Sequence, residues 1–155
     1  NVGNDPTKLE AYRNNVMQWA DQLPDECRLL CECHPGTVLE TLDAATAFFE
    51  NLDPVRWGFI AHISGDEQAL DNWASAFKSR LAHVHLQLRN AETDPQTPTG
   101  RAYLTACVQV LKCHDFQGTA TIEFTRGIGR DEAIDDLYQN ACTDQKSFRE
   151  VWQTA

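Results

Sequence analysis

The segment Arg28–Gly36, RLLCECHPG, decides the fold that we expect for this chain. Its first six residues form a short and mostly apolar run, which is typical of a buried strand, and the residues His34-Pro35-Gly36 form a turn. Apolar residues at helical spacing cover residues 8–23 before this strand and residues 39–52 after it. A buried strand between two amphipathic helices is the repeating unit of an α/β protein.

The same alternation continues to the end of the chain. Further strands are predicted at residues 55–63, 81–88 and 119–124, and further helices at residues 66–79, around 103–111 and from 131 onward. Either Ser64 or Asp66 is suited to cap the helix at 66–79, and the last helix is predicted to break near Thr143. Residues 1–155 are therefore expected to form a single α/β domain.

Strict alternation predicts parallel strands joined by right-handed crossovers. Two architectures satisfy this pattern, a TIM-type barrel and a small doubly wound sheet. An eight-stranded barrel typically needs about 250 residues. A chain of 155 residues with four strands would therefore supply a partial barrel, about one half.

Composition narrows the classes of function. The formal net charge of −10 argues against nucleic-acid binding, because that binding uses Lys and Arg to neutralise phosphates. No apolar run approaches the roughly 18 residues of a membrane span, and the N-terminal region lacks the pattern of a signal peptide. Cys31 and Cys33 share one strand face and cannot pair with each other. We therefore expect reduced cysteines, no membrane association and a cytoplasmic location.

Polar side chains gather where the predicted strands end. In parallel α/β proteins these carboxyl ends meet at one edge of the sheet, where ligands bind. Side chains alternate along a strand, so Glu32 and His34 share a face, as do His83 and His85. The full set of strand-end candidates is Glu32, His34, His62, His83, His85 and Glu123, with Arg126 just beyond.

These segments, in this order and spacing, resemble the xylose isomerase-like TIM barrels, a family of sugar-phosphate isomerases and epimerases. The matching segments are residues 29–37, the strand with His62, residues 82–86 and residues 121–123. The resemblance implies the fifth to eighth strands, which is the C-terminal half of the barrel. It also implies a divalent metal ion (Mn²⁺, Mg²⁺ or Zn²⁺) bound by Glu32, His85 and Glu123, with His62 as a substitute for the fourth ligand.

The resemblance further implies a reaction on a small sugar or sugar phosphate. Glu32 and Glu123 would exchange a proton with the carbon next to a carbonyl group, whose oxygen the metal would polarise. His34 and His83 would contact the substrate, and Arg126 in the loop 125–130 would bind a substrate phosphate. A half-barrel alone would expose an apolar face, so we expect a homodimer or association with the missing half.

Two positions depart from the family pattern. Phe59 stands where the family has an Asp three residues before the His, and Leu88 stands where members often have an Asp after the His-x-His strand. Both changes remove a carboxylate from the expected site. They favour an alternative hypothesis, a non-catalytic, degenerate or truncated barrel without an intact metal site.

Overall fold

The computed structural model describes residues 5–155 and shows an α/β protein. Helices and strands alternate along the chain as expected, with a short 3₁₀ helix (η2, Lys78–Arg80) before the third strand. The elements in order are α1 (Pro6–Ala20), β1 (Leu29–Glu32), α2 (Leu42–Phe49), β2 (Trp57–Ile63), α3 (Glu67–Ala76), β3 (Leu81–Gln87), α4 (Pro98–Cys113), β4 (Thr119–Phe124) and α5 (Ile134–Thr154).

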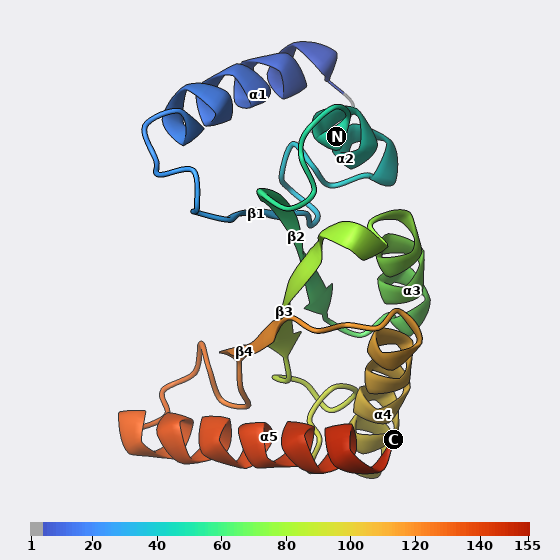
Figure 1. Ribbon diagram of the computed structural model, residues 1–155. Coiled ribbons are helices and arrows are strands. Elements are labelled where there is room, and N and C mark those ends of the chain that lie inside the picture. Colours follow the sequence, from blue (N-terminus) through green and yellow to red (C-terminus); the bar gives the residue numbers. More distant parts are fainter. Residues whose placement is uncertain (1–4) are drawn as a thin grey trace.

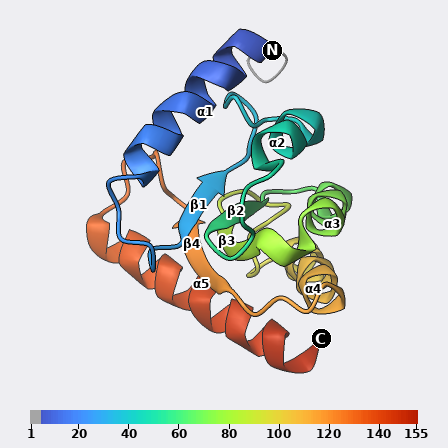
Figure 2. The same ribbon diagram turned by 45° about the horizontal axis from the view of Figure 1, so that its top comes forward.

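The four strands form one parallel sheet in the order β1-β2-β3-β4. Each strand therefore pairs with its neighbour in the sequence, and the helices connect successive strands. Figures 1 and 2 both show α2, α3 and α4 on the same side of the sheet, with α1 and α5 near its two ends. Within residues 5–155, the other side of the sheet carries no helix over its middle (Figures 1 and 2).

Two helix boundaries test the sequence-based expectations. Asp66, and not Ser64, is the N-cap of α3, because its carboxylate accepts a hydrogen bond of 2.9 Å from the backbone N–H of Ala69. The break predicted near Thr143 is wrong, since α5 runs without interruption from Ile134 to Thr154. The Thr143 hydroxyl donates to the carbonyl of Gln139 one turn earlier, so this β-branched residue is accommodated inside the helix.

The hydrophobic core lies between the sheet and α2, α3 and α4. Alternate strand residues such as Cys31, Val84 and Leu86 point into it, and they meet helix residues such as Phe48 and Leu104. Five aromatic rings stack edge to face or tilted across β2, α2 and α3: Phe48, Phe49, Trp57, Phe59 and Phe77. This packing anchors β2 against α2 and the end of α3, next to the candidate site.

Arg80 connects three segments at the amino end of the sheet. Its guanidinium donates to the backbone carbonyls of Phe49, Leu52 and Trp57 at 3.1, 2.6 and 3.0 Å. These carbonyls belong to the end of α2, the loop that follows it and the first residue of β2. Arg80 therefore holds the α2–β2 connection against the start of β3.

Within residues 5–155 no helix combines the length and the apolar character needed to cross a membrane. The six cysteines are all free thiols, including Cys31 and Cys33, whose shared strand face excludes a bond between them. Three of them, Cys31, Cys33 and Cys107, are buried in the core.

Candidate metal centre

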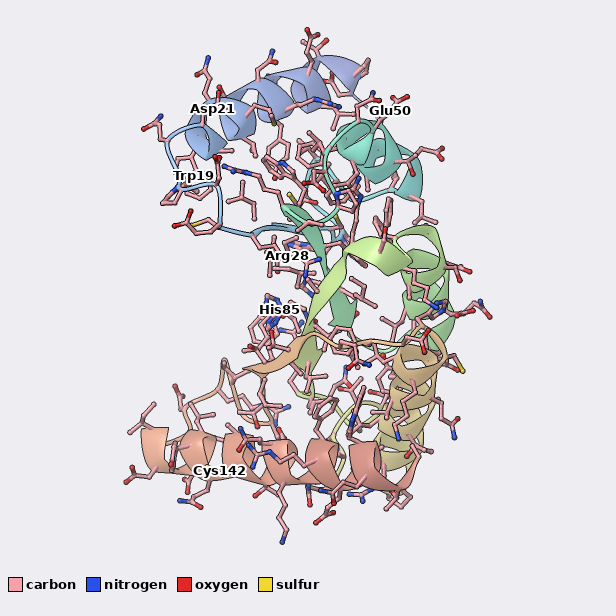
Figure 3. All side chains as sticks on the ribbon, viewed as in Figure 1. Trp19, Asp21, Arg28, Glu50, His85 and Cys142 are labelled. Carbon is pink, nitrogen blue, oxygen red and sulfur yellow. The ribbon has the colours of Figure 1, made fainter. Side chains whose placement is uncertain are left out.

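One side chain from each strand reaches a common point on the helix-free face of the sheet. Glu32 ends β1, His62 and His85 lie in neighbouring register positions on β2 and β3, and Glu123 lies near the end of β4. All four project from the same face because the strands are parallel and side chains alternate. Figure 3 shows His85 on the open side of the sheet, away from α3 and α4. The structure thus brings the four sequence-predicted ligands together.

Glu32, His62 and His85 form the tightest group. Glu32 Oε1 lies 3.0 Å from His62 Nε2 and 3.2 Å from His85 Nδ1. One ligand atom from each of the three residues lies within 4.8 Å of the others, so the group is able to hold a metal ion. Donor atoms about 2.1 Å from a shared ion are themselves roughly 3 to 3.5 Å apart in tetrahedral or octahedral sites. The separations of 3.0 and 3.2 Å from Glu32 Oε1 match that spacing.

The two imidazoles have nitrogen atoms that lack hydrogen-bond partners. His62 Nε2 and His85 Nδ1 are buried and make no hydrogen bond, although Glu32 Oε1 is close to both. A buried polar atom without a partner carries a desolvation cost of about 1 to 3 kcal/mol. Nitrogens that are close to a carboxylate but not aligned with it are arranged as ligands of a shared ion would be.

Glu123 lies on the other side of His62. Its Oε2 atom is 3.6 Å from His62 Nδ1 and 3.5 Å from His85 Nδ1. Because Glu32 approaches the Nε2 atom of His62, the two carboxylates contact opposite nitrogens of the same ring. Glu123 therefore borders the triad, and its Oε2 atom is almost as close to His85 Nδ1 as Glu32 Oε1 is.

Gln87 is a site residue that sequence reasoning missed. Its Nε2 atom lies 3.0 Å from both His62 Nδ1 and Glu123 Oε2. A metal ion on His62 Nε2 requires the proton to sit on Nδ1, where the Glu123 carboxylate would accept it, while the Gln87 amide donates to Glu123. The alternation from His83 through His85 to residue 87 places Gln87 on the same face, and this was the pattern that could have identified it.

Burial affects the charge of the histidines. Desolvation lowers the pKa of His62 below its ordinary value, and the nearby Glu123 and Glu32 oppose this shift only in part. Desolvation also lowers the pKa of His83, with a further contribution from His85. Both rings are therefore biased toward the neutral form, which is the form that binds metal ions.

Two of the three residues expected to contact substrate, His34 and His83, lie near the triad. His34 is near the triad, with Nε2 3.8 Å from Glu32 Oε2 and its ring 5.1 Å from that of His62. His83 packs against His85 at 5.2 Å, and its Nδ1 is 2.6 Å from the hydroxyl of Thr119. Both residues therefore belong to the same polar face as the triad.

Arg126 has partners away from the triad. Its guanidinium lies 3.5 Å from Asp94 and donates to the side chain of Asn140 at 2.9 Å. In the same loop, the N–H groups of Ile128 and Arg130 donate to carbonyls of the loop itself. The N–H groups that would cradle a phosphate are thus partly occupied, and phosphate binding by Arg126 stays a prediction.

Phe59 and Leu88, the two departures from the family pattern, are both buried in the core. Phe59 stacks on Trp73 of α3, with ring centroids 5.5 Å apart and 25° between the planes. Neither side chain has an atom that binds a metal ion. The packing of Phe59 on Trp73 shows that this residue contributes to the core.

A cavity of about 680 Å³ opens beside His62, and of the three triad residues only His62 lines it. It is bordered by His34, His62 and Glu123, and by the ends of the strands and loops that follow them. Gln87, Arg89 and Phe124 also line it, and Arg89 is another residue that sequence reasoning did not select. A cavity of this volume is within the usual range for small-molecule sites.

No known protein family model matches the chain, and no curated protein is significantly similar to it. Statements about function therefore depend on the geometry of the site and on the resemblance of the short strand-end segments.

Proposed function

We propose that this protein binds a divalent metal ion and catalyses proton transfer on a small sugar or sugar phosphate, as an isomerase or epimerase. The observation that carries the proposal is the convergence of Glu32, His62 and His85, whose buried nitrogens lack hydrogen-bond partners. The similarity of the strand-end segments to xylose isomerase-like barrels supports the same reaction class.

Glu32, His62 and His85 would hold the ion. Two imidazoles and one carboxylate suit Zn²⁺ or Mn²⁺ better than Mg²⁺, which prefers oxygen ligands and keeps several waters. When bound, the ion would act as a Lewis acid on a carbonyl or hydroxyl oxygen of the substrate. The open cavity beside the triad leaves room for such a ligand.

Glu123 is the stronger candidate for the mobile proton. Its carboxylate is partly exposed to the cavity, and the Gln87 amide donates to it at 3.0 Å, which fixes its direction. Glu32 would serve as the second acid or base through the oxygen that faces His34. Two carboxylates on opposite sides of His62 would allow removal of a proton from one carbon and its return from another side.

We also propose that the sheet is half of a TIM-type barrel. The consecutive strand order and the position of α2, α3 and α4 on one side support a barrel over a doubly wound sheet, in which strand order reverses and helices cover both faces. The edges of β1 and β4 have no strand neighbour within residues 5–155. A second copy of the chain or a separate half-barrel would pair with them, and the free thiols favour a cytoplasmic location.

A non-catalytic barrel is the second candidate function. The observation that favours it is the complete burial of Leu88 and the stacking of Phe59 on Trp73, because both positions serve packing where the family pattern has a carboxylate. In this case the polar face would be a remnant of a site without a reaction.

Two measurements on the full chain distinguish these candidates. Calorimetric titration with Zn²⁺ or Mn²⁺ should show one site, lost in Glu32→Gln and kept in the matched surface variant Glu26→Gln. Deuterium exchange from D₂O into a panel of sugars and sugar phosphates should then show turnover that Glu123→Gln abolishes. Absence of metal binding to the wild-type chain would remove the proposed function and leave the non-catalytic one.

A further inference from the structure

Arg89 is a cation beside the metal site that has no carboxylate partner. It follows β3 by two residues, is exposed to solvent and lines the same cavity as His62 and Glu123. Within residues 5–155, arginine ion pairs involve only Arg56, Arg101 and Arg126. The charge of Arg89 is therefore not neutralised by an ion pair among these residues.

Stacking holds this guanidinium in place. Its Cζ atom lies 4.6 Å from the ring centroid of Phe124, at the end of β4. Stacking uses the flat face of a guanidinium and leaves the N–H donors along its edge free. Those donors form a planar fork that matches two oxygens of a carboxylate or phosphate. Phe124 lines the cavity as well, so the stacked pair is part of the cavity wall.

The charged side chains that line the cavity are acidic except for Arg89 and the histidines. Glu40, Asp66 and Glu123 line the same cavity, and among its lining residues Arg89 is the only Lys or Arg. The whole chain has a formal net charge of −10, so its general field repels anions. An anionic ligand would therefore depend on this one local cation.

We propose that Arg89 binds an oxyanion group of the ligand and selects anionic over neutral sugars. The ligand is the substrate of the proposed function, so this part of the inference rests on that function. Anion binding by Arg89 does not require the metal ion. Phosphate monoesters and carboxylates share the chemistry that the fork recognises. The anionic group of the ligand is therefore placed at Arg89 and not at the loop of Arg126, because Arg126 already contacts Asp94 and Asn140.

The test is a titration of the full chain, first free of metal and then with Mn²⁺, using inorganic phosphate and malonate as probes. Binding is followed by calorimetry and, for phosphate, by ³¹P line width. The variants are Arg89→Gln, Arg89→Lys, Phe124→Leu and Arg126→Gln. The Mn²⁺ affinity of each variant is measured separately and serves as a check of folding and of the triad.

Saturable binding of either probe is expected to weaken about tenfold or more in Arg89→Gln, since a charge-assisted hydrogen bond is lost. Arg89→Lys and Phe124→Leu should weaken it less, and Arg126→Gln should leave it within about twofold. Tighter binding of phosphate indicates a sugar phosphate, and tighter binding of malonate indicates a sugar acid.

Three outcomes would overturn the inference. These are the absence of saturable binding of both probes to the wild-type chain, unchanged binding in Arg89→Gln, and loss of binding in Arg126→Gln alone. If the wild-type chain binds no metal, the proposed function fails while the anion titration still decides the role of Arg89.

Discussion

His62 Nε2 lies 3.0 Å from Glu32 Oε1, and no hydrogen bond joins the two atoms. At this distance an imidazole N–H that pointed at the carboxylate would form a strong hydrogen bond. His62 Nε2 and His85 Nδ1 therefore both lie close to Glu32 Oε1 and both remain without a hydrogen-bond partner. Two buried imidazole nitrogens at one place therefore carry an uncompensated desolvation cost. A bound cation would offset this cost.

Metal binding should stabilise the folded protein. An ion that binds only the native state at a concentration 100 times its Kd adds about 2.7 kcal/mol to the free energy of unfolding. For a domain of this size the midpoint temperature should rise by roughly 5 to 10 °C. Thermal unfolding with Zn²⁺ and with a chelator measures this shift. Glu32→Gln should show little shift and Glu26→Gln the full one, and equal shifts in both variants would contradict the triad.

Gln87→Met should weaken metal binding without unfolding the protein. The change removes the amide that contacts both His62 Nδ1 and Glu123 Oε2, and with it a partner that orients the ring. Loss of such an orienting partner typically lowers metal affinity by about tenfold or more. Competition with a Zn²⁺ chelator gives the Kd, and the exposed variant Gln139→Met is the matched control. A Kd equal to that of the wild type would show that Gln87 has no orienting role.

Arg80→Met should destabilise the fold. Three backbone carbonyls, those of Phe49, Leu52 and Trp57, would lose their side-chain donor. We expect a loss of about 2 to 3 kcal/mol in the free energy of unfolding, measured by urea denaturation. The exposed residue Arg130 provides the control, Arg130→Met, which should change stability by less than about 0.5 kcal/mol. Equal stabilities of the two variants would mean that water satisfies these carbonyls.

Asp144 should make stability depend on pH in an unusual direction. Burial raises the pKa of its carboxyl to about 6, partly offset by the hydrogen bond of 2.6 Å from Thr125. The folded state then binds the proton more tightly than the unfolded state. This stabilising contribution is fully present below about pH 4 and is lost as the pH rises through 6.

The expected size is about 2 to 3 kcal/mol between these limits. Urea denaturation of the wild type and of Asp144→Asn, at several pH values from 4 to about 8, isolates the contribution of this one carboxyl from that of the others. The advantage of the Asn variant should grow as the pH rises. A difference that stays constant over this range would show that Asp144 titrates normally.

The cysteines should divide into two classes in a thiol-labelling experiment. Cys113 and Cys142 are exposed and should react at once with a disulfide reagent. Burial raises the pKa of Cys31 to about 11 and of Cys107 to about 12, and it also raises that of Cys33. These three thiols should react only after denaturation. Mass spectrometry of the labelled peptides would show the pattern, and rapid labelling of Cys33 in native protein would contradict the packing.

Local patterns in the sequence were sufficient for the α/β alternation and for much of the site. Apolar spacing located each helix and strand to within a few residues, because burial of one helix face or one strand face is a local property. Alternation also placed Glu32 with His34 on one strand face and His83 with His85 on another. The family resemblance selected Glu32, His85 and Glu123 as ligands, with His62 as a substitute.

Only the tertiary structure decided how these residues meet. The distances from Glu32 to His62 and His85 follow from the register of the parallel strands, including the irregularities at Phe59/Ile60 and Leu86/Gln87. The role of Gln87 depends on two neighbours that come from β2 and β4. The free charge of Arg89 and the engaged charge of Arg126 depend on which side chains happen to lie beside them. Sequence spacing predicts which face of a strand or helix a side chain occupies. The partners of that side chain depend on contacts between segments that are far apart in the chain.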